Sequence, residues 1–147
     1  CDPVSSAYAR RLKPYVGKVH TLKPNRMELT VLTGHDTDTP KGVKAACEIL
    51  LCRGVKRIFV SMGHEGCLYM DSEGNVVQRA LSPIENIANA SGAGDAFTAA
   101  VIYSYLKGFG INRTIDYALA AGAVAAATTI NPEISPELIE KIIIERG

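Results

Sequence analysis

The chain has 147 residues, of which 47% are hydrophobic and 21% are charged, and its formal net charge is +1. This length suits one domain with a core of its own, and the composition is that of a folded globular protein rather than a disordered one. The 16 basic residues are scattered, which argues against a nucleic-acid-binding face. The longest weakly polar run, 118–130, is too short and too rich in Ala, Gly and Thr to span a bilayer.

The cysteines show neither a CxxC spacing nor histidine partners at the spacing of zinc ligands; they are Cys1, Cys47, Cys52 and Cys67. We therefore expect free thiols, buried or half-buried, in a reducing compartment, which favours a cytoplasmic location. The chain opens with CDPVS, which is typical of a strand running into a turn, and it has no initiator Met. We expect it to be a piece of a longer protein.

The first half of the chain predicts helices and strands in alternation. A helix over 5–13 and a short strand over 19–22 precede Pro24, after which Asn25 and Glu28 form a capping-box pattern at the start of a helix that stops at Gly34. A third helix is expected after Thr39, which is a good N-cap, with Pro40 as its first residue. This helix should run to about Cys52, with Gly54 at the C-cap.

The second half predicts a strand, a hairpin and then a run of helices. The strand covers 56–63, and the hairpin pairs 66–70 with 75–80. Helices are expected over 96–108, over 113–129 with Asn112 as its cap, and over 136–146 after Ser135. Strands alternating with helices indicate an α/β sandwich around a largely parallel sheet.

The turn NASGAGDAF, residues 89–97, carries the chemistry, and several interpretations compete for it. A Walker P-loop needs a lysine that is absent, and a Rossmann fingerprint needs a glycine where Phe97 stands. A plain helix start, with Asp95 favoured by the helix dipole, remains open. In the functional alternative, the amides of Gly92, Ala93 and Gly94 stabilise the charge of a phosphoryl group in transfer, and Asp95 accepts the proton of the attacking hydroxyl.

Three motifs, in order, resemble those of the ribokinase-like (PfkB-type) carbohydrate kinases. NASGAGDAF resembles that family's Asp-Thr-x-Gly-Ala-Gly-Asp-x-Phe signature, KPNRMEL its Asn-x-x-Glu motif, and SMGHEG its Thr-x-Gly-x-x-Gly strand end. The resemblance implies a three-layer α/β/α sandwich with a mainly parallel sheet. Residues 1–147 would be the C-terminal, ATP-binding part of the kinase domain, without the N-terminal half and the lid.

The resemblance also implies roles for the matching positions. Asp95 would be the base, and the Gly92–Gly94 turn the anion hole. Asn25 and Glu28 would help to hold Mg²⁺ and the triphosphate through waters, although a plain capping box is compatible with that role. Ser61, Gly63 and Gly66 would line the nucleotide channel, and a plain turn is the alternative. The small residues of 121–126 would pack near the adenine, or simply within the core.

Two departures from the family pattern matter. Asn89-Ala90 replaces Asp-Thr, which puts an activating K⁺ site in doubt, with Asn89 and Ser91 still able to offer oxygens. The N-terminal half that supplies most sugar-binding residues is absent. The segment 20–34 looks most like the pseudouridine-kinase branch, followed by general nucleoside and sugar kinases.

The predicted function is ATP-dependent phosphoryl transfer to a hydroxymethyl group of a sugar or nucleoside, with Mg²⁺. The alternatives are a non-catalytic nucleotide- or sugar-binding module, or an inactive structural fragment of such a kinase. Nucleic acid and membrane are not expected as partners. A truncated parallel sheet leaves an open edge, so we expect self-association through that edge or a homo-oligomer.

Overall fold

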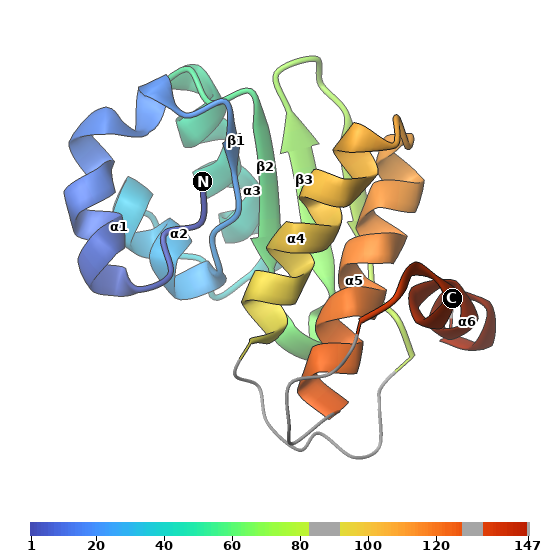
Figure 1. The fold of residues 1–147 in the computed structure, drawn as a ribbon. Coiled ribbons are helices and arrows are strands. Elements are labelled where there is room, and N and C mark those ends of the chain that lie inside the picture. The colour runs from blue at the N-terminus through green and yellow to red at the C-terminus, as the bar shows by residue number, and fades with distance from the viewer. Residues whose placement is uncertain (83–91, 128–133, 147) are drawn as a thin grey trace. The chain divides into compact units, whose positions relative to one another are not determined.

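A computed structural model describes residues 1–82, 92–127 and 134–146 of the chain (Figure 1). The chain divides into two compact units. The first comprises Cys1–Gly63 and Cys67–Gln78, and the second comprises His64–Gly66 and Arg79–Gly147.

The first unit is a small sheet with three helices. Its helices are α1 (Ser6–Leu12), α2 (Arg26–Thr33) and α3 (Pro40–Cys52), and a 3₁₀ turn covers Lys13–Lys18. A second 3₁₀ turn, Gly63–Glu65, belongs to the first unit at Gly63 and to the second unit at its other two residues. The strands are β1 (Thr21–Leu22), β2 (Arg57–Ser61), β3 (Cys67–Asp71) and β4 (Val76–Arg79), and they lie in the order β1-β2-β3-β4. Figure 1 shows α1, α2 and α3 beside β1 and β2.

The sheet is mixed, whereas the sequence predicts a mainly parallel one. β1 runs parallel to β2, and β2 runs antiparallel to β3 with Phe59 opposite Tyr69. The physical reason is the length of the connections, because parallel neighbours need a crossover of a dozen or more residues and a short turn reverses the chain. The β1–β2 connection contains α2 and α3, while a single 3₁₀ turn joins β2 to β3.

β2 and β3 are apolar on both faces, which explains their continuous hydrophobic runs. On one face, Ile58 and Val60 belong to the core of the first unit, which also includes Leu22, Leu29, Leu32, Val43, Leu50, Leu68 and Met70. On the other face, the rings of Phe59 and Tyr69 lie 4.8 Å apart between centroids, and both side chains are buried. A strand buried on both faces loses the alternation of a half-buried strand.

The predicted caps at Asn25 and Thr39 in the first unit are confirmed, and the structure adds a cap at Ser5. Ser5 caps α1, Asn25 caps α2 and Thr39 caps α3, each with a side-chain oxygen that accepts a backbone N–H. Gly34 ends α2 with a φ of 80°, a left-handed conformation that favours glycine. These interactions join residues within four positions of one another, so the sequence predicts them well.

The second unit is built on three helices: α4 (Ala93–Leu106), α5 (Ile111–Ala127) and α6 (Pro136–Arg146). Figure 1 shows α4 and α5 side by side along their length. The rings of Tyr103 and Tyr117 stack at 5.6 Å, and Phe109 meets Tyr117 edge-on at 5.5 Å. The Tyr117 hydroxyl donates to the Pro136 carbonyl at 3.3 Å, which ties α6 to α5.

The prediction that Asn112 caps α5 is wrong. The helix begins at Ile111, which places Asn112 within the first turn. The carbonyl of Gly110 accepts the N–H of Thr114 at 3.0 Å and its hydroxyl at 3.1 Å, so the helical hydrogen bonds start two residues earlier than expected. The predicted helix end near Thr129 lies outside the described residues.

The cysteine prediction is confirmed only in part. All four thiols are free, but Cys1 and Cys52, the last residue of α3, are exposed. Cys47 and Cys67 are buried, and burial raises the pKa of each thiol to about 12.

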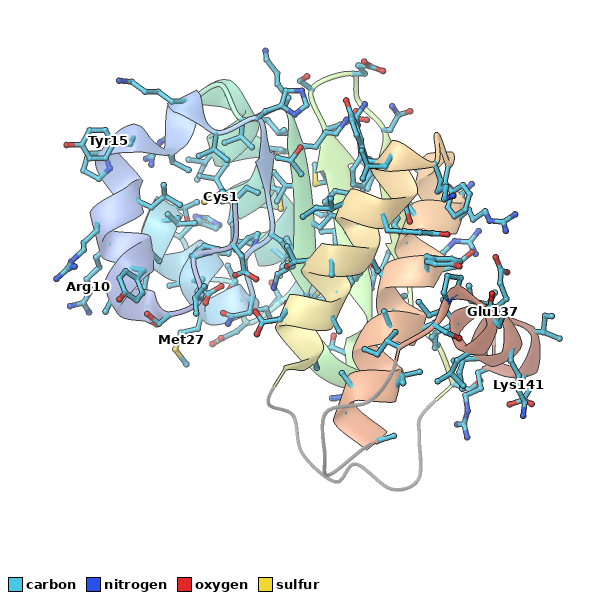
Figure 2. All side chains as sticks on the ribbon, viewed as in Figure 1. Cys1, Arg10, Tyr15, Met27, Glu137 and Lys141 are labelled. Atoms are coloured by element: carbon cyan, nitrogen blue, oxygen red, sulfur yellow. The ribbon has the colours of Figure 1, made fainter. Side chains whose placement is uncertain are left out.

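Figure 2 shows Arg10, Tyr15 and Met27 pointing away from the first unit, and Glu137 and Lys141 pointing away from α6. On α6 the buried side chain is that of Ile139, which is 5% exposed, whereas Ile144 is 83% exposed. In the part of the chain that the structure describes, no helix is both long and apolar enough to cross a bilayer.

Candidate active site

The candidate residues fall into two groups, one on each unit. The first group lies where β1 and β2 end. A parallel bridge joins Asn25 to Ser61, and the Ser61 N–H donates to the Pro24 carbonyl at 3.0 Å. Parallel strands bring their carboxyl ends to the same edge of a sheet, so two motifs 36 positions apart start side by side, at Asn25 and Ser61.

Asn25 and Glu28 form a complete capping box at the start of α2. The Asn25 Oδ1 accepts the Glu28 N–H at 2.9 Å, and the Glu28 Oε2 accepts the Asn25 N–H at 2.9 Å. Glu28 is 2% exposed, whereas Asn25 is exposed to solvent. The capping interpretation is therefore confirmed, and it fixes the rotamers of both side chains.

This arrangement still fits a magnesium site of the kind that nucleotides complete. Protein sites for Mg²⁺ usually provide one or two carboxylates and leave the other positions to phosphates and waters. The cap occupies one oxygen of Glu28, and its other oxygen has no hydrogen bond among the described residues. No group of three or more His, Cys, Asp or Glu that could hold a metal by itself occurs in the ranges that the structure describes. The donor set therefore suits an ion held jointly with a triphosphate.

Lys23, at the end of β1, also belongs to this edge of the sheet, although no sequence motif assigns it a role. Its ammonium group lies 3.0 Å from the carboxylate of Asp2, and the side chain is largely buried. The sequence feature that could have pointed to Lys23 is its place directly before Pro24 in the KPN motif. The ion pair holds the end of β1 in position next to Asn25.

The glycines that follow β2 differ in their surroundings. Among the described residues, no atom lies within 4 Å of a Cβ built on Gly63, so they leave the backbone there open to an approaching group. A Cβ on Gly66, which has a φ of 84°, would lie 2.0 Å from the Arg79 carbonyl oxygen. Gly66 is thus required by packing within the second unit, as a plain turn predicts, while Gly63 is free to serve a ligand.

The second group lies at the start of α4. Gly92 occupies the N-cap with a φ of 86°, and the first helical hydrogen bond runs from the Ala96 N–H to the Gly92 carbonyl at 2.9 Å. Among the described residues, no side chain caps this helix, whereas side chains cap α1, α2, α3 and α6. The amides at the start of a helix have no partner within it, so they remain available to an anion.

Asp95 lies in the first turn of α4 and is exposed to solvent. Within the described ranges, its carboxylate makes no hydrogen bond or ion pair. The helix begins at Ala93, inside the NASGAGDAF motif rather than after it. Asn89 and Ser91, the candidate potassium ligands, lie outside the described residues.

Small residues of α5 pack as a core helix predicts. Ala120, Ala121, Val124 and Ala125 are buried. Ala121 also lines an apolar cavity of about 360 Å³ in the second unit, whose other walls include Ala100, Tyr103, Tyr117 and Ile139. Core packing thus accounts for Ala121, Val124 and Ala125, while Gly122, Ala123 and Ala126 are half-buried, and the role near the adenine stays a prediction.

Comparison with known proteins gives the family. The model of the pfkB family carbohydrate kinases matches residues 1–133. The chain belongs to this family. It is 33% identical over 126 residues to the 1-phosphofructokinase of Haemophilus influenzae, covering 86% of this chain and 39% of that protein. It is 31% identical over 137 residues to the pseudouridine kinase of Escherichia coli, covering 91% of this chain and 43% of that protein.

Solved structures of pfkB-type kinases give the same fold. A putative sugar kinase from Clostridium perfringens superposes with a TM-score of 0.93 at 25% identity, over 99% of this chain and 46% of that one. A putative ribokinase from Escherichia coli, solved with ATP and Mg²⁺, superposes with a TM-score of 0.80 at 26% identity, over 95% of this chain and 44% of that one. The chain is thus an α/β fragment of the ribokinase-like fold and spans about two-fifths of the curated relatives it matches.

The specific branch stays undecided. The pseudouridine kinase is one of several similar relatives, and the likeness to the 1-phosphofructokinase is of the same order. The resemblance of 20–34 to the pseudouridine-kinase branch therefore stays a prediction.

Proposed function

We propose that the pfkB-family protein that carries this chain transfers the γ-phosphoryl group of ATP to a hydroxymethyl group of a sugar or nucleoside. The observation that supports this most is the start of α4. A left-handed Gly92 opens the helix, no described side chain caps it, and the carboxylate of Asp95 stands exposed in the first turn. A purely structural helix start gains about 1 kcal/mol from a side-chain cap, and within the described ranges α4 has none.

Each group of residues has a task in this reaction. The hydroxyl oxygen of the acceptor bonds to the γ-phosphorus, the bond to the ADP oxygen breaks, and the hydroxyl proton passes to Asp95. The amides of Gly92, Ala93 and Gly94 stabilise the negative charge on the phosphoryl oxygens. Mg²⁺, when bound, would neutralise the charge of the triphosphate. Glu28 would orient the waters of that ion, and the fixed cap keeps its carboxylate in one rotamer.

The nucleotide channel and the monovalent cation are further parts of the proposal. Ser61 and Gly63, at the end of β2, would lie along the nucleotide, and Gly66 would shape the turn. Asn89 and Ser91 are the candidate ligands for K⁺. A cytoplasmic location is proposed from the free thiols alone.

The test is turnover by the full-length protein with ATP, Mg²⁺ and a panel of acceptors: ribose, deoxyribose, pseudouridine and the fructose phosphates. Asp95→Asn should lower kcat by a factor on the order of 10² to 10⁴, while the affinity for ATP stays nearly the same. Asp38→Asn, an identical change on an exposed loop, is the matched control and should have no effect.

Near-normal turnover of Asp95→Asn would contradict the role of this carboxylate as a base. Binding of ATP and acceptor without any transfer by the wild type would favour the alternative of a non-catalytic binding module. The chain by itself, which lacks more than half of the length of its relatives, should be inactive.

A further inference from the structure

Gly122, in the middle of α5, faces the first turn of α4. A Cβ built on Gly122 would lie 3.2 Å from the carbonyl oxygen of Ala93 and 3.9 Å from the Cβ of Phe97. A contact of 3.2 Å between a methyl carbon and a carbonyl oxygen is tighter than ordinary van der Waals contact. The two helices approach this closely because residue 122 has no side chain.

The carbonyl that Gly122 faces belongs to the proposed anion hole. A peptide group is planar, so the Ala93 carbonyl and the Gly94 N–H move as one rigid unit. The Gly94 N–H is one of the donors that we assign to the transferring phosphoryl group. A push on the carbonyl therefore turns a donor away from its target.

The next turn of α4 cannot absorb this push easily. The Thr98 hydroxyl donates to the Gly94 carbonyl at 2.9 Å, and the side chain of Phe97 is 4% exposed. The hydrogen bond of Thr98 and the burial of Phe97 hold α4 in place directly after Ala93, the residue that the Cβ would contact. A methyl group on residue 122 should thus rotate or shift the peptide between Ala93 and Gly94 by a few tenths of an ångström.

We infer that Gly122 is a positioning residue, which keeps the amides at the start of α4 aligned for phosphoryl transfer. This inference rests on the proposed function, because it assigns a task to the same turn. The effect belongs to the transition state, since preorganised donors act on charge that develops there. Gly122 should therefore influence kcat rather than the binding of ATP.

The test compares Gly122→Ala with Gly110→Ala in the full-length protein. A Cβ on Gly110 meets no described atom within 4 Å, so this variant makes the same chemical change without a contact among the described residues. Gly122→Ala should lower kcat about tenfold, because even small misplacement of catalytic groups is costly, and the KM for ATP should stay nearly the same. Gly110→Ala should leave both constants unchanged.

Two further measurements separate positioning from folding. Alanine is the better helix former by about 1 kcal/mol, so Gly122→Ala should melt at or above the temperature of the wild type. ADP alone should bind the variant and the wild type equally, whereas ADP with aluminium fluoride, a mimic of the phosphoryl group in transfer, should bind the variant about tenfold more weakly.

The outcomes distinguish this inference from the proposed function. Equal kcat and equal binding of the aluminium fluoride complex in Gly122→Ala and the wild type would overturn the role of Gly122 and leave the kinase intact. A variant that melts far below the wild type would also overturn it, because Gly122 would then serve the fold. A wild type that phosphorylates no acceptor would overturn the proposed function and this inference with it.

Discussion

Asp71 holds the turn between β3 and β4 with both of its carboxylate oxygens. Its Oδ1 accepts the N–H groups of Glu73 and Asn75 at 3.0 Å each, and its Oδ2 accepts the Asn75 amide at 2.8 Å and the Tyr69 hydroxyl at 2.9 Å. Burial alone would raise the pKa of Asp71, but hydrogen bonds from Asn75, Tyr69 and Glu73 outweigh it and lower the pKa. The ionised form is therefore the one that the fold stabilises.

Replacing Asp71 by Ala should lower the free energy of unfolding by about 1–3 kcal/mol at neutral pH. Because the folded pKa is depressed, this contribution is present above the unfolded value of about 3.9 and is lost as the pH falls through the folded pKa. Urea denaturation of the wild type and the variant at neutral pH, and then at successively lower pH below about 4, measures the difference.

The Asp71→Ala difference should shrink as the pH falls, while Asp38→Ala, on an exposed loop, should change stability little at any pH. If the loss of unfolding free energy in Asp71→Ala stayed constant as the pH fell, the charge of the carboxylate would not matter for the turn.

At the scale of the element, α2 combines a capping box with a proposed metal site, and the two roles can be separated. Glutamine keeps the oxygen that accepts the Asn25 N–H, and it occurs in capping boxes as glutamate does. It lacks the negative charge that Mg²⁺ and its waters would sense. Glu28→Gln therefore keeps the cap and removes the charge.

Glu28→Gln should leave the free energy of unfolding within about 0.5–1 kcal/mol of the wild type. The Mg²⁺ concentration for half-maximal turnover by the full-length protein should rise about tenfold, because a charge-assisted contact is lost. Glu48→Gln, which changes an exposed glutamate of α3, is the control and should change neither quantity. An unchanged Mg²⁺ requirement in Glu28→Gln would leave Glu28 with the cap as its only role.

At the scale of the whole molecule, the sheet of the first unit has an edge at β1. The Cys1 N–H donates to the Thr21 carbonyl at 2.7 Å, and the Lys23 N–H donates to the Cys1 carbonyl at 2.9 Å. These two hydrogen bonds bracket Leu22 as a parallel neighbour would. The backbone of Cys1 thus makes the pairing of a strand end, as its sequence CDPVS predicts.

An edge strand attracts further strands, so the chain by itself should self-associate as its concentration rises. Light scattering during gel filtration measures this, and a clean monomer at high concentration would count against it. Apolar side chains on α4 offer another route, since Ile102 is 57%, Tyr105 67% and Leu106 80% exposed. Leu106→Glu should leave association through the β1 edge unchanged. If the variant no longer self-associated, the association would run through α4 and not through the β1 edge.

The sequence by itself determined what depends on near neighbours along the chain. Helix starts at Ser5, Asn25 and Thr39 and the stop at Gly34 each involve residues within four positions. Three short motifs, taken in order, indicated the family that the comparison confirms. The N-cap of α5 escaped prediction because Gly110, Asn112 and their neighbours offer competing starts, and the hydrogen bonds of Thr114 decide between them.

Only the tertiary structure decided which distant residues meet. The bridge from Asn25 to Ser61 and the approach of Gly122 to Ala93 both join residues more than twelve positions apart. No local pattern encodes such a contact, because it arises when whole elements pack. Gly122 looks like one more small residue of an alanine-rich helix, and its closeness to the start of α4 follows from the packing of the two helices.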